Sequence, residues 1–412
     1  MFIDCVWGQK SYRMVSQKMN RQMMKKMISQ LFLIAASIEL IMAICSECKL
    51  EVPHSRFILW GLLLVYGLKV VSNQYSAREY AVFAFILVLG IANYISGGIN
   101  AILKAGIFLY ALKGEDYKKI VRYLMGCLIT VSIVMYIRAL TFGDTGLMYM
   151  QDVRINRGFD GLRYTFGYSN SNRFMGTVFT IAMMILYILQ PEIRKALIVS
   201  GICMLIVIVL YYFTDTRTVP ALTLFVLVLY NFAIGINKKW INRIITGIFE
   251  ISSSIEVLLS VLASCHVNNF LMSKIDTAIS GRFKQLGDVQ FTQNYPLVYA
   301  ENWHFLSSYD NQAGCDLGFA FIFYYYGVIA AIVLICFIVY TAVMIYRQKE
   351  YYKFTILTGL CTYTFMEIYF FSNYISKNFL LIFCALTVWE SRQGRNVNGQ
   401  EEVKTIDHYP GI

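Results

Sequence analysis

Arginine side chains occur in three polar segments that separate long apolar stretches of the chain. The first, residues 157–176, contains Arg163 and runs directly into an apolar stretch. The second is a short turn with Arg217, and the third is a long segment with Arg282 in its early part. A guanidinium group presents a planar fork of donors that fits a phosphate or a carboxylate with two parallel hydrogen bonds. The three segments therefore predict the binding of an anionic group such as a phosphate.

The first segment has the composition of a ligand-binding loop that leads into a helix. Gly167 allows the backbone to approach a ligand closely, and Asn170 and Asn172 are suited to cap the helix that follows. A capped helix start leaves amide donors aimed at the membrane surface. Three cations accompany these residues, namely Arg157, Arg163 and Arg173. A helix cap with interfacial arginines explains the same residues equally well, and both interpretations stay open.

The other two segments also have a structural as well as a functional explanation. In the turn 213–220, Arg217 either binds a ligand or forms an ion pair with Asp215. In the long segment 266–317, the side chains singled out are Asp316 and His304. For Asp316 a helix-capping role competes with catalysis, and for His304, which lies between aromatic residues, packing is the commoner role.

Several chemistries lack their usual motif in this chain. There is no Asp-x-Asp pair for a metal-bound nucleotide-sugar donor, no phosphate-binding loop, no dinucleotide fingerprint and no Gly-x-Ser-x-Gly nucleophile elbow. Cys45 and Cys48 have Cys-x-x-Cys spacing, but no second pair accompanies them, which argues against zinc. We therefore expect neither a metal nor a cofactor.

A helical membrane domain must position these segments. Of 412 residues, 58% are hydrophobic and only 15% are charged, and a soluble core cannot bury apolar runs of about 20 residues in this number. We predict an all-α polytopic membrane protein with about twelve transmembrane helices. The expected spans are 28–46, 57–73, 79–96, 100–112, 121–141, 173–189, 196–213, 218–236, 245–264, 318–345, 352–371 and 375–390.

The basic residues indicate which face of the membrane is cytoplasmic. With these spans, 22 of the 36 lysines and arginines fall on one face, eleven on the other, and three within or at the ends of spans. The richer face is cytoplasmic by the positive-inside rule, and both termini lie there. On the outer face arginine outnumbers lysine seven to four. Because topology disfavours cations there, the outer arginines are the ones expected to bind a ligand.

The expected organisation follows from this topology. It comprises a basic amphipathic cytoplasmic segment (1–27), spans one to nine with an outer loop at 142–172 (28–264), a long, partly helical extracytoplasmic loop (265–317), spans ten to twelve (318–390) and a cytoplasmic tail (391–412). The net charge of +11 is dispersed over short cytoplasmic loops, which favours contact with anionic membrane lipid over nucleic acid.

Four short motifs follow one another in the outer segments. They are Arg163-Tyr-Thr-Phe-Gly-Tyr-Ser-Asn-Ser-Asn172 before a span, Thr214-Asp-Thr-Arg217-Thr218 in a turn, Ser280-Gly281-Arg282 in the long loop, and Asp316 before an aromatic span that reaches Tyr326-Gly327. Their order and outer location resemble the polysaccharide polymerase branch of the O-antigen polymerase/ligase (Wzy-like) family. The ligase members place a histidine–asparagine pair where this chain has Asp316, so their base does not carry over.

The resemblance implies an inverting, metal-independent glycosyltransferase of the bacterial cytoplasmic (inner) membrane, with its active site facing outward. A growing glycan would pass from undecaprenyl pyrophosphate to a sugar hydroxyl of a newly flipped repeat unit, in capsule, exopolysaccharide or O-antigen synthesis. The arginines would stabilise the pyrophosphate leaving group. Asp316, at the family's acidic position, would be the base, with His304 as the alternative. A flippase and a chain-length regulator are the implied protein partners.

A flippase or transporter of lipid-linked oligosaccharide is the alternative function. It would also need cations, but deep within the membrane rather than at the outer ends of spans. For the polymerase, we expect Arg163, Arg217 and Arg282 to converge on one outer cavity, because a diphosphate is best held from several sides.

The lack of an Asp-x-Asp pair predicts activity without a divalent metal. The purified protein should polymerise its lipid-linked substrate in excess EDTA as fast as with magnesium, because arginines neutralise the leaving group. Product length on a gel checks this expectation. An activity that EDTA abolishes and magnesium or manganese restores would contradict the arginine mechanism.

Overall fold

The computed structural model describes most of the chain, and most of what it describes is helical. The described residues are 2–143, 145–154, 159–189, 193–236, 238–264, 270–278, 281–283, 304–307, 317–367, 371 and 374–392. In the first helix, side chains are described from Gln22 onward. Arg157, Asp316 and all but the first two residues of the expected tail 391–412 lie outside the described part.

Within the described residues, nine helices are long and apolar enough to cross a membrane, as expected of a multi-pass membrane protein. Large apolar side chains such as Phe57, Leu64 and Val71 are exposed on them, which suits contact with lipid. The nine helices are α1 (Phe2–Glu47, apolar from Gln22), α2 (Ser55–Ser72), α3 (Ala77–Gly97), α5 (Tyr117–Thr141), α7 (Ser171–Ile188), α8 (Ile193–Thr214), α9 (Thr218–Gly235), α10 (Lys239–Ser264) and α14 (Val328–Gln348).

Three shorter helical segments occupy other predicted spans, namely α4 (Ala101–Ala111), α15 (Tyr352–Met366) and residues 380–392. With 15 residues at 1.5 Å each, α15 is about 22 Å long, less than the hydrocarbon layer of about 30 Å. Both α15 and residues 380–392 are almost entirely buried, and α15 packs against α7, α9, α10 and α14. They form the centre of the protein, where neighbouring helices shield their ends from lipid.

The fold is all-α as predicted, but the outer loop expected at 142–172 contains a β-hairpin that was not foreseen. One helical turn, α6 (Thr145–Met148), leads into strand β1 (Tyr149–Arg154), which pairs antiparallel with β2 (Phe159–Tyr164). Tyrosine, valine and phenylalanine in these stretches favour strands. Such short stretches give a much weaker sequence signal than a long apolar helix does.

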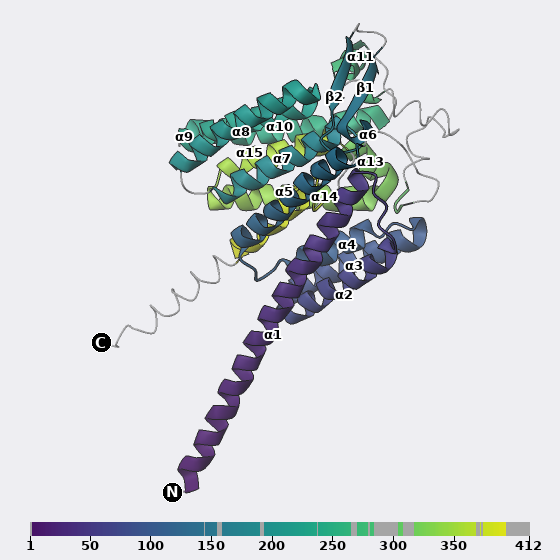
Figure 1. Cartoon of the computed structure of the whole chain (residues 1–412). Coiled ribbons are helices and arrows are strands. Elements are labelled where there is room, and N and C mark those ends of the chain that lie inside the picture. Colours follow the sequence, from purple (N-terminus) through teal and green to yellow (C-terminus); the bar gives the residue numbers. More distant parts are fainter. Residues whose placement is uncertain are drawn as a thin grey trace.

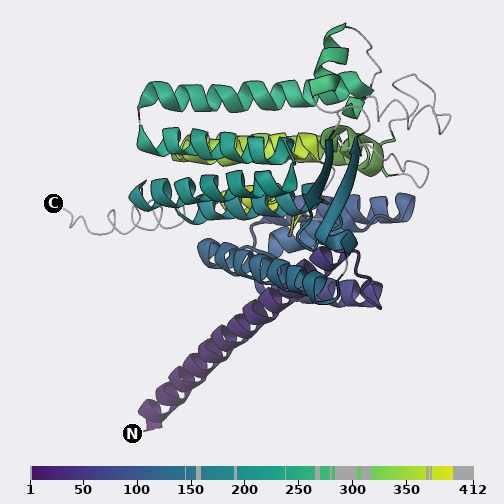
Figure 2. The ribbon, with the colours of Figure 1, turned by 45° about the horizontal axis from the view of Figure 1, so that its top comes forward.

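The helices run roughly side by side, so the molecule has two ends (Figure 1). The hairpin, α11 (Phe270–Ala278) and α13 (Gly318–Phe321) lie at one end, which we name the hairpin end (Figure 2). The first residues of α1 lie at the opposite end, the terminal end (Figure 2). Arg392 also lies at the terminal end, because it bonds to Glu79 at the start of α3, at 2.6 Å. The first and last described residues therefore share one end.

The tenth predicted span, 318–345, is not one continuous helix. It is divided into α13, a π-helix (Ile322–Tyr326) and α14, with Gly327 between the last two. Gly327 has φ 88° and ψ 162°, a conformation essentially restricted to glycine. The aromatic run that was expected inside a membrane helix therefore lies before it.

Segment 304–307 occupies the space beside this break. The first two amides of α14 donate to the carbonyls of His304 and Phe305, at 3.0 and 3.2 Å. The amide and hydroxyl of Ser307 both donate to Asn93 of α3, at 2.8 Å each. A short piece of the long loop is thus fixed between α3 and α14, and it binds the amides that open α14.

Gly327→Ala should lower the free energy of unfolding by about 2–4 kcal/mol. The new Cβ would lie 2.6 Å from the carbonyl oxygen of Phe305, in a backbone conformation that alanine avoids. Gly201→Ala in α8 is the matched control, because no atom lies within 4 Å of its added Cβ. Thermal unfolding in detergent compares the two, and equal midpoints would refute this explanation of the break.

Candidate functional site

A polar segment interrupts the central helices near the hairpin end. It separates α15 from the helix of residues 380–392, and Glu367, Lys377 and Asn378 within it are buried. The side-chain amide of Asn378 donates to the hydroxyl of Thr364 at 2.9 Å, and its Oδ1 accepts from the backbone amide of Leu380, which opens the next helix, at 3.1 Å. Non-helical backbone at membrane depth is tolerated only where protein or a cavity surrounds it. This break therefore provides a protected place for polar groups.

Glu47, the last residue of α1, holds two cations at this break. Its carboxylate forms ion pairs with Lys377 and with Arg173, the latter at 3.2 Å. The side chains of Glu47 and Lys377 are 4% and 0% exposed, so this pair is shielded from bulk water. The carbonyl of Glu47 also accepts a hydrogen bond from the Ser169 amide at 3.0 Å. These contacts tie the first arginine segment to the end of α1.

Arg282 comes from the long loop and pairs with Glu367 of the same break. The two charged groups lie 3.3 Å apart, and their side chains are only 10% and 11% exposed. Asp276 of α11 fixes the preceding turn, since its carbonyl and carboxylate oxygens accept from the amides of Gly281 and Phe283. Gly281 has φ 77°, which explains the glycine of the Ser-Gly-Arg motif.

These groups form one electrostatic unit. Arg173 and Lys377 share the carboxylate of Glu47, and Glu367, the partner of Arg282, lies near enough to favour the charged form of Lys377. Among the described residues, three cations and two carboxylates therefore lie together in a poorly solvated place, where charges interact strongly. We name this set the hairpin-end charge cluster, and its members are Glu47, Arg173, Arg282, Glu367 and Lys377.

The first and second arginine segments meet at another ion pair. Arg163, at the end of β2, is 6% exposed and lies 3.3 Å from Asp215 in the turn before α9. The sequence left open an ion pair between Asp215 and Arg217, but in the structure Asp215 pairs with Arg163. Of the three arginines expected to converge, Arg163 and Arg282 are buried beside carboxylates, whereas Arg217 is exposed.

The remaining residues of the first segment position the loop. Gly167 has φ 87°, and a Cβ there would lie 2.8 Å from the carbonyl oxygen of Met135 in α5. The glycine therefore lets the loop backbone pack closely against α5, rather than against a ligand as was expected. Asn170 caps α7 by accepting from the Arg173 amide at 2.8 Å, as expected for one of the two asparagines. Asn172 instead lies exposed in the first turn. The cap fixes the first turn of α7 and so holds Arg173 in its ion pair with Glu47.

Of the two candidate bases, only His304 lies within the described residues. Its side chain is exposed rather than packed between rings, and its carbonyl is bound by α14. Asp316 falls outside, but Gly318, two residues later, lies against the carbonyl oxygen of Glu367 with no room for a Cβ. The chain that follows Asp316 is therefore anchored at the break.

Two other titratable groups near Glu47 stay neutral. Burial raises the pKa of Tyr168 to about 12, and its hydroxyl lies 2.7 Å from that of Ser132. Burial likewise raises the pKa of Cys48 to about 12. At neutral pH the phenol and the thiol both keep their protons, so neither serves as the base or nucleophile of this site.

Glu47, Glu367 and Lys377 were not among the site residues predicted from the sequence. Each lies at the edge of an apolar stretch. Lys377 was considered only as one of the basic residues that indicate the orientation in the membrane. An ionisable residue in or beside a transmembrane segment is by default a functional candidate, and that signal was present. The ion pair between Glu47 and Lys377 could not be predicted, because the two residues are 330 positions apart in the sequence.

Glu47→Gln should lower the free energy of unfolding by about 3–5 kcal/mol, because it leaves buried Lys377 and Arg173 without their shared carboxylate. Glu51→Gln removes the same charge four positions later at an exposed site and should have little effect. Thermal unfolding in detergent measures both. If the two variants unfold at the same temperature, the buried ion pairs do not hold the site together.

Comparison with known proteins adds no assignment. The chain matches no protein-family model, no curated protein and no solved structure. A function must therefore be argued from the charge cluster and from the motifs of the sequence.

Proposed function

We propose that this protein is a polymerase of lipid-linked oligosaccharide repeat units. It transfers a growing capsular, exo- or O-antigen glycan from undecaprenyl pyrophosphate to a hydroxyl of the next unit, with inversion at the anomeric carbon. The hairpin end faces outward from the bacterial cytoplasmic membrane. The excess of basic residues in the loops of the terminal end supports that orientation.

The observation that carries the proposal is the hairpin-end charge cluster. Its cations come from the first turn of α7, the long loop and the break after α15, three parts of the chain that are far apart in sequence. A pyrophosphate leaving group gains negative charge as its bond to the sugar breaks, and fixed cations in a dry site stabilise that charge. Each charge-assisted hydrogen bond contributes about 1.5–3 kcal/mol.

The chemistry assigns two roles to this chain. Arg173, Arg282 and Lys377 bind the pyrophosphate, while Glu47 and Glu367 keep these cations oriented before the substrate arrives. The acceptor hydroxyl attacks the anomeric carbon from the face opposite the pyrophosphate, which inverts the linkage, and a base removes its proton.

Arg282→Lys should reduce polymerisation about tenfold or more, because an ammonium cannot reproduce the two-pronged contact of a guanidinium. Arg243→Lys, an exposed site at the start of α10, is the control and should keep full activity. Purified variants are given lipid-linked repeat units, and the product length is read on a gel. Normal chain length from Arg282→Lys would remove the basis for the proposal.

The base is assigned to Asp316, with His304 as its rival. Asp316→Asn keeps the shape of the side chain but cannot accept a proton at neutral pH, so it should abolish polymer formation at normal protein levels. His304→Gln, at an exposed side chain, should leave chain length unchanged. The opposite pattern would assign the step to the histidine.

One observation favours the flippase alternative. Lys104 pairs with Glu39 at 2.9 Å within the bundle, and Tyr66 and Tyr374 donate to the same carboxylate at 2.7 and 3.0 Å. Deep charges of this kind also occur in transport pathways. Vesicles containing the protein and a fluorescent lipid-linked oligosaccharide separate the two functions, since a flippase moves the lipid across the bilayer without lengthening the glycan.

A further inference from the structure

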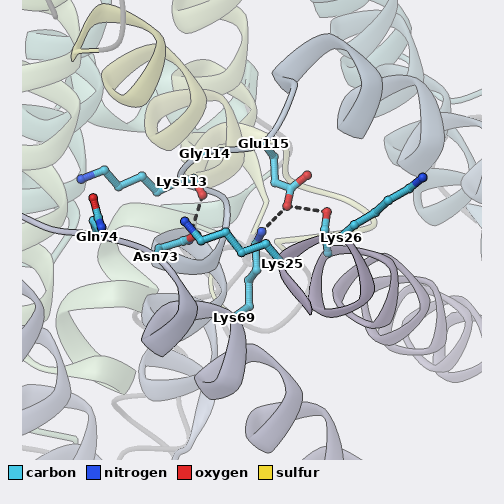
Figure 3. A pocket seen from close by; sticks show the side chains of 9 residues that line it. Lys25, Lys26, Lys69, Asn73, Gln74, Lys113, Gly114 and Glu115 are labelled. Carbon is cyan, nitrogen blue, oxygen red and sulfur yellow. Dashed lines mark hydrogen bonds and ion pairs between the residues drawn. The ribbon is translucent and has the colours of Figure 1, made fainter. Parts of the chain in front are cut away.

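A polar cavity of about 350 Å³, whose lining side chains are drawn in Figure 3, lies at the terminal end. It is formed by α1, by the end of α2 and by the connection between α4 and α5. Of its nine lining residues, one is a carboxylate, Glu115, and four are lysines, namely Lys25, Lys26, Lys69 and Lys113. A cavity with this lining attracts anions.

The carboxylate of the cavity is already engaged. Glu115 forms an ion pair with Lys69, which is 5% exposed, and accepts a hydrogen bond from Ser29 at 2.5 Å. Lys113 pairs with Glu79, outside the cavity lining, at 2.7 Å. Lys25 and Lys26 are exposed, and neither has an ion pair within the part of the chain that the structure describes. The ammonium group of Lys25 is thus available to an external anion in the cavity, and Lys26 adds positive charge beside it.

The arrangement of the side chains suits a phosphate. Lys25 extends toward Asn73, whereas Lys26 points away from the other lining side chains (Figure 3). Gln74 adds an amide to the wall. The ammonium group of Lys25 from α1 and the amide of Gln74 just after α2 thus both line this cavity, and such donors can bind the oxygens of a phosphate.

We propose that this cavity binds the phosphate head group of an anionic phospholipid from the leaflet at the terminal end. The apolar part of α1 begins at Gln22 and α2 ends at Ser72, so the cavity lies at the level where spans leave the bilayer. On the same turns of α1, Met23, Met24 and Met27 are 62%, 55% and 55% exposed. A lipid can place its acyl chains on this apolar surface and its head group in the cavity, which a soluble phosphate cannot do.

Native mass spectrometry of the full-length protein in detergent tests this proposal. Phosphatidylglycerol should remain bound after delipidation, whereas phosphatidylcholine, which has no net charge, should not. Lys25→Gln should reduce retention of phosphatidylglycerol about fivefold. Lys239→Gln, which removes an exposed lysine elsewhere on the terminal end, should leave retention unchanged. Equal effects of the two variants would mean diffuse attraction and would overturn the site.

A second variant tests the same cavity in the opposite direction. Glu115→Gln removes the internal competitor for Lys69, so phosphatidylglycerol should be retained more strongly and should raise the unfolding temperature more than in the wild type. In a separate measurement, inorganic phosphate is added as a competitor of the lipid. If it displaces the lipid at equal concentration, the cavity is a soluble-phosphate site and the lipid assignment is wrong. This inference is independent of the proposed polymerase activity.

Discussion

The buried ion pairs of Glu47 hold together parts of the chain that are distant in sequence. One carboxylate joins the end of α1 to Arg173 at the start of α7 and to Lys377 in the break between the central helices. Charges removed from water are costly unless they are paired, so removing one partner leaves the others uncompensated. The position of the first arginine segment, and through Lys377 that of the break, therefore depends on this residue.

The same physical constraint explains the layout of the protein. Outer helices expose apolar side chains such as Leu64 and Val71, while α15 and residues 380–392 are buried and too short to reach both faces of a bilayer. Short central helices leave room inside the protein for polar backbone and charged side chains near the hairpin end. Lipid contact is thus confined to the outer helices, and polar chemistry is confined to a protected interior.

The sequence predicted the helices well, because a long apolar run has few alternatives in a chain of this composition. It also predicted the cap at Asn170, whose signal is local. The break at Gly327 was missed because it depends on a distant segment, 304–307, that binds the start of α14. The β-hairpin was missed because its strands are short. The partners of Glu47 and Arg282 lie far away in sequence, and no periodic pattern encodes such pairings.

The central claim is that the hairpin-end charge cluster binds the pyrophosphate of a lipid-linked glycan. An experimental structure of the protein with undecaprenyl-pyrophosphate-linked oligosaccharide bound tests it most directly. The account predicts that the diphosphate contacts Arg282 and Arg173 at the hairpin end. A diphosphate located instead at Lys104 within the bundle, or in the lysine-lined cavity of the terminal end, would contradict it.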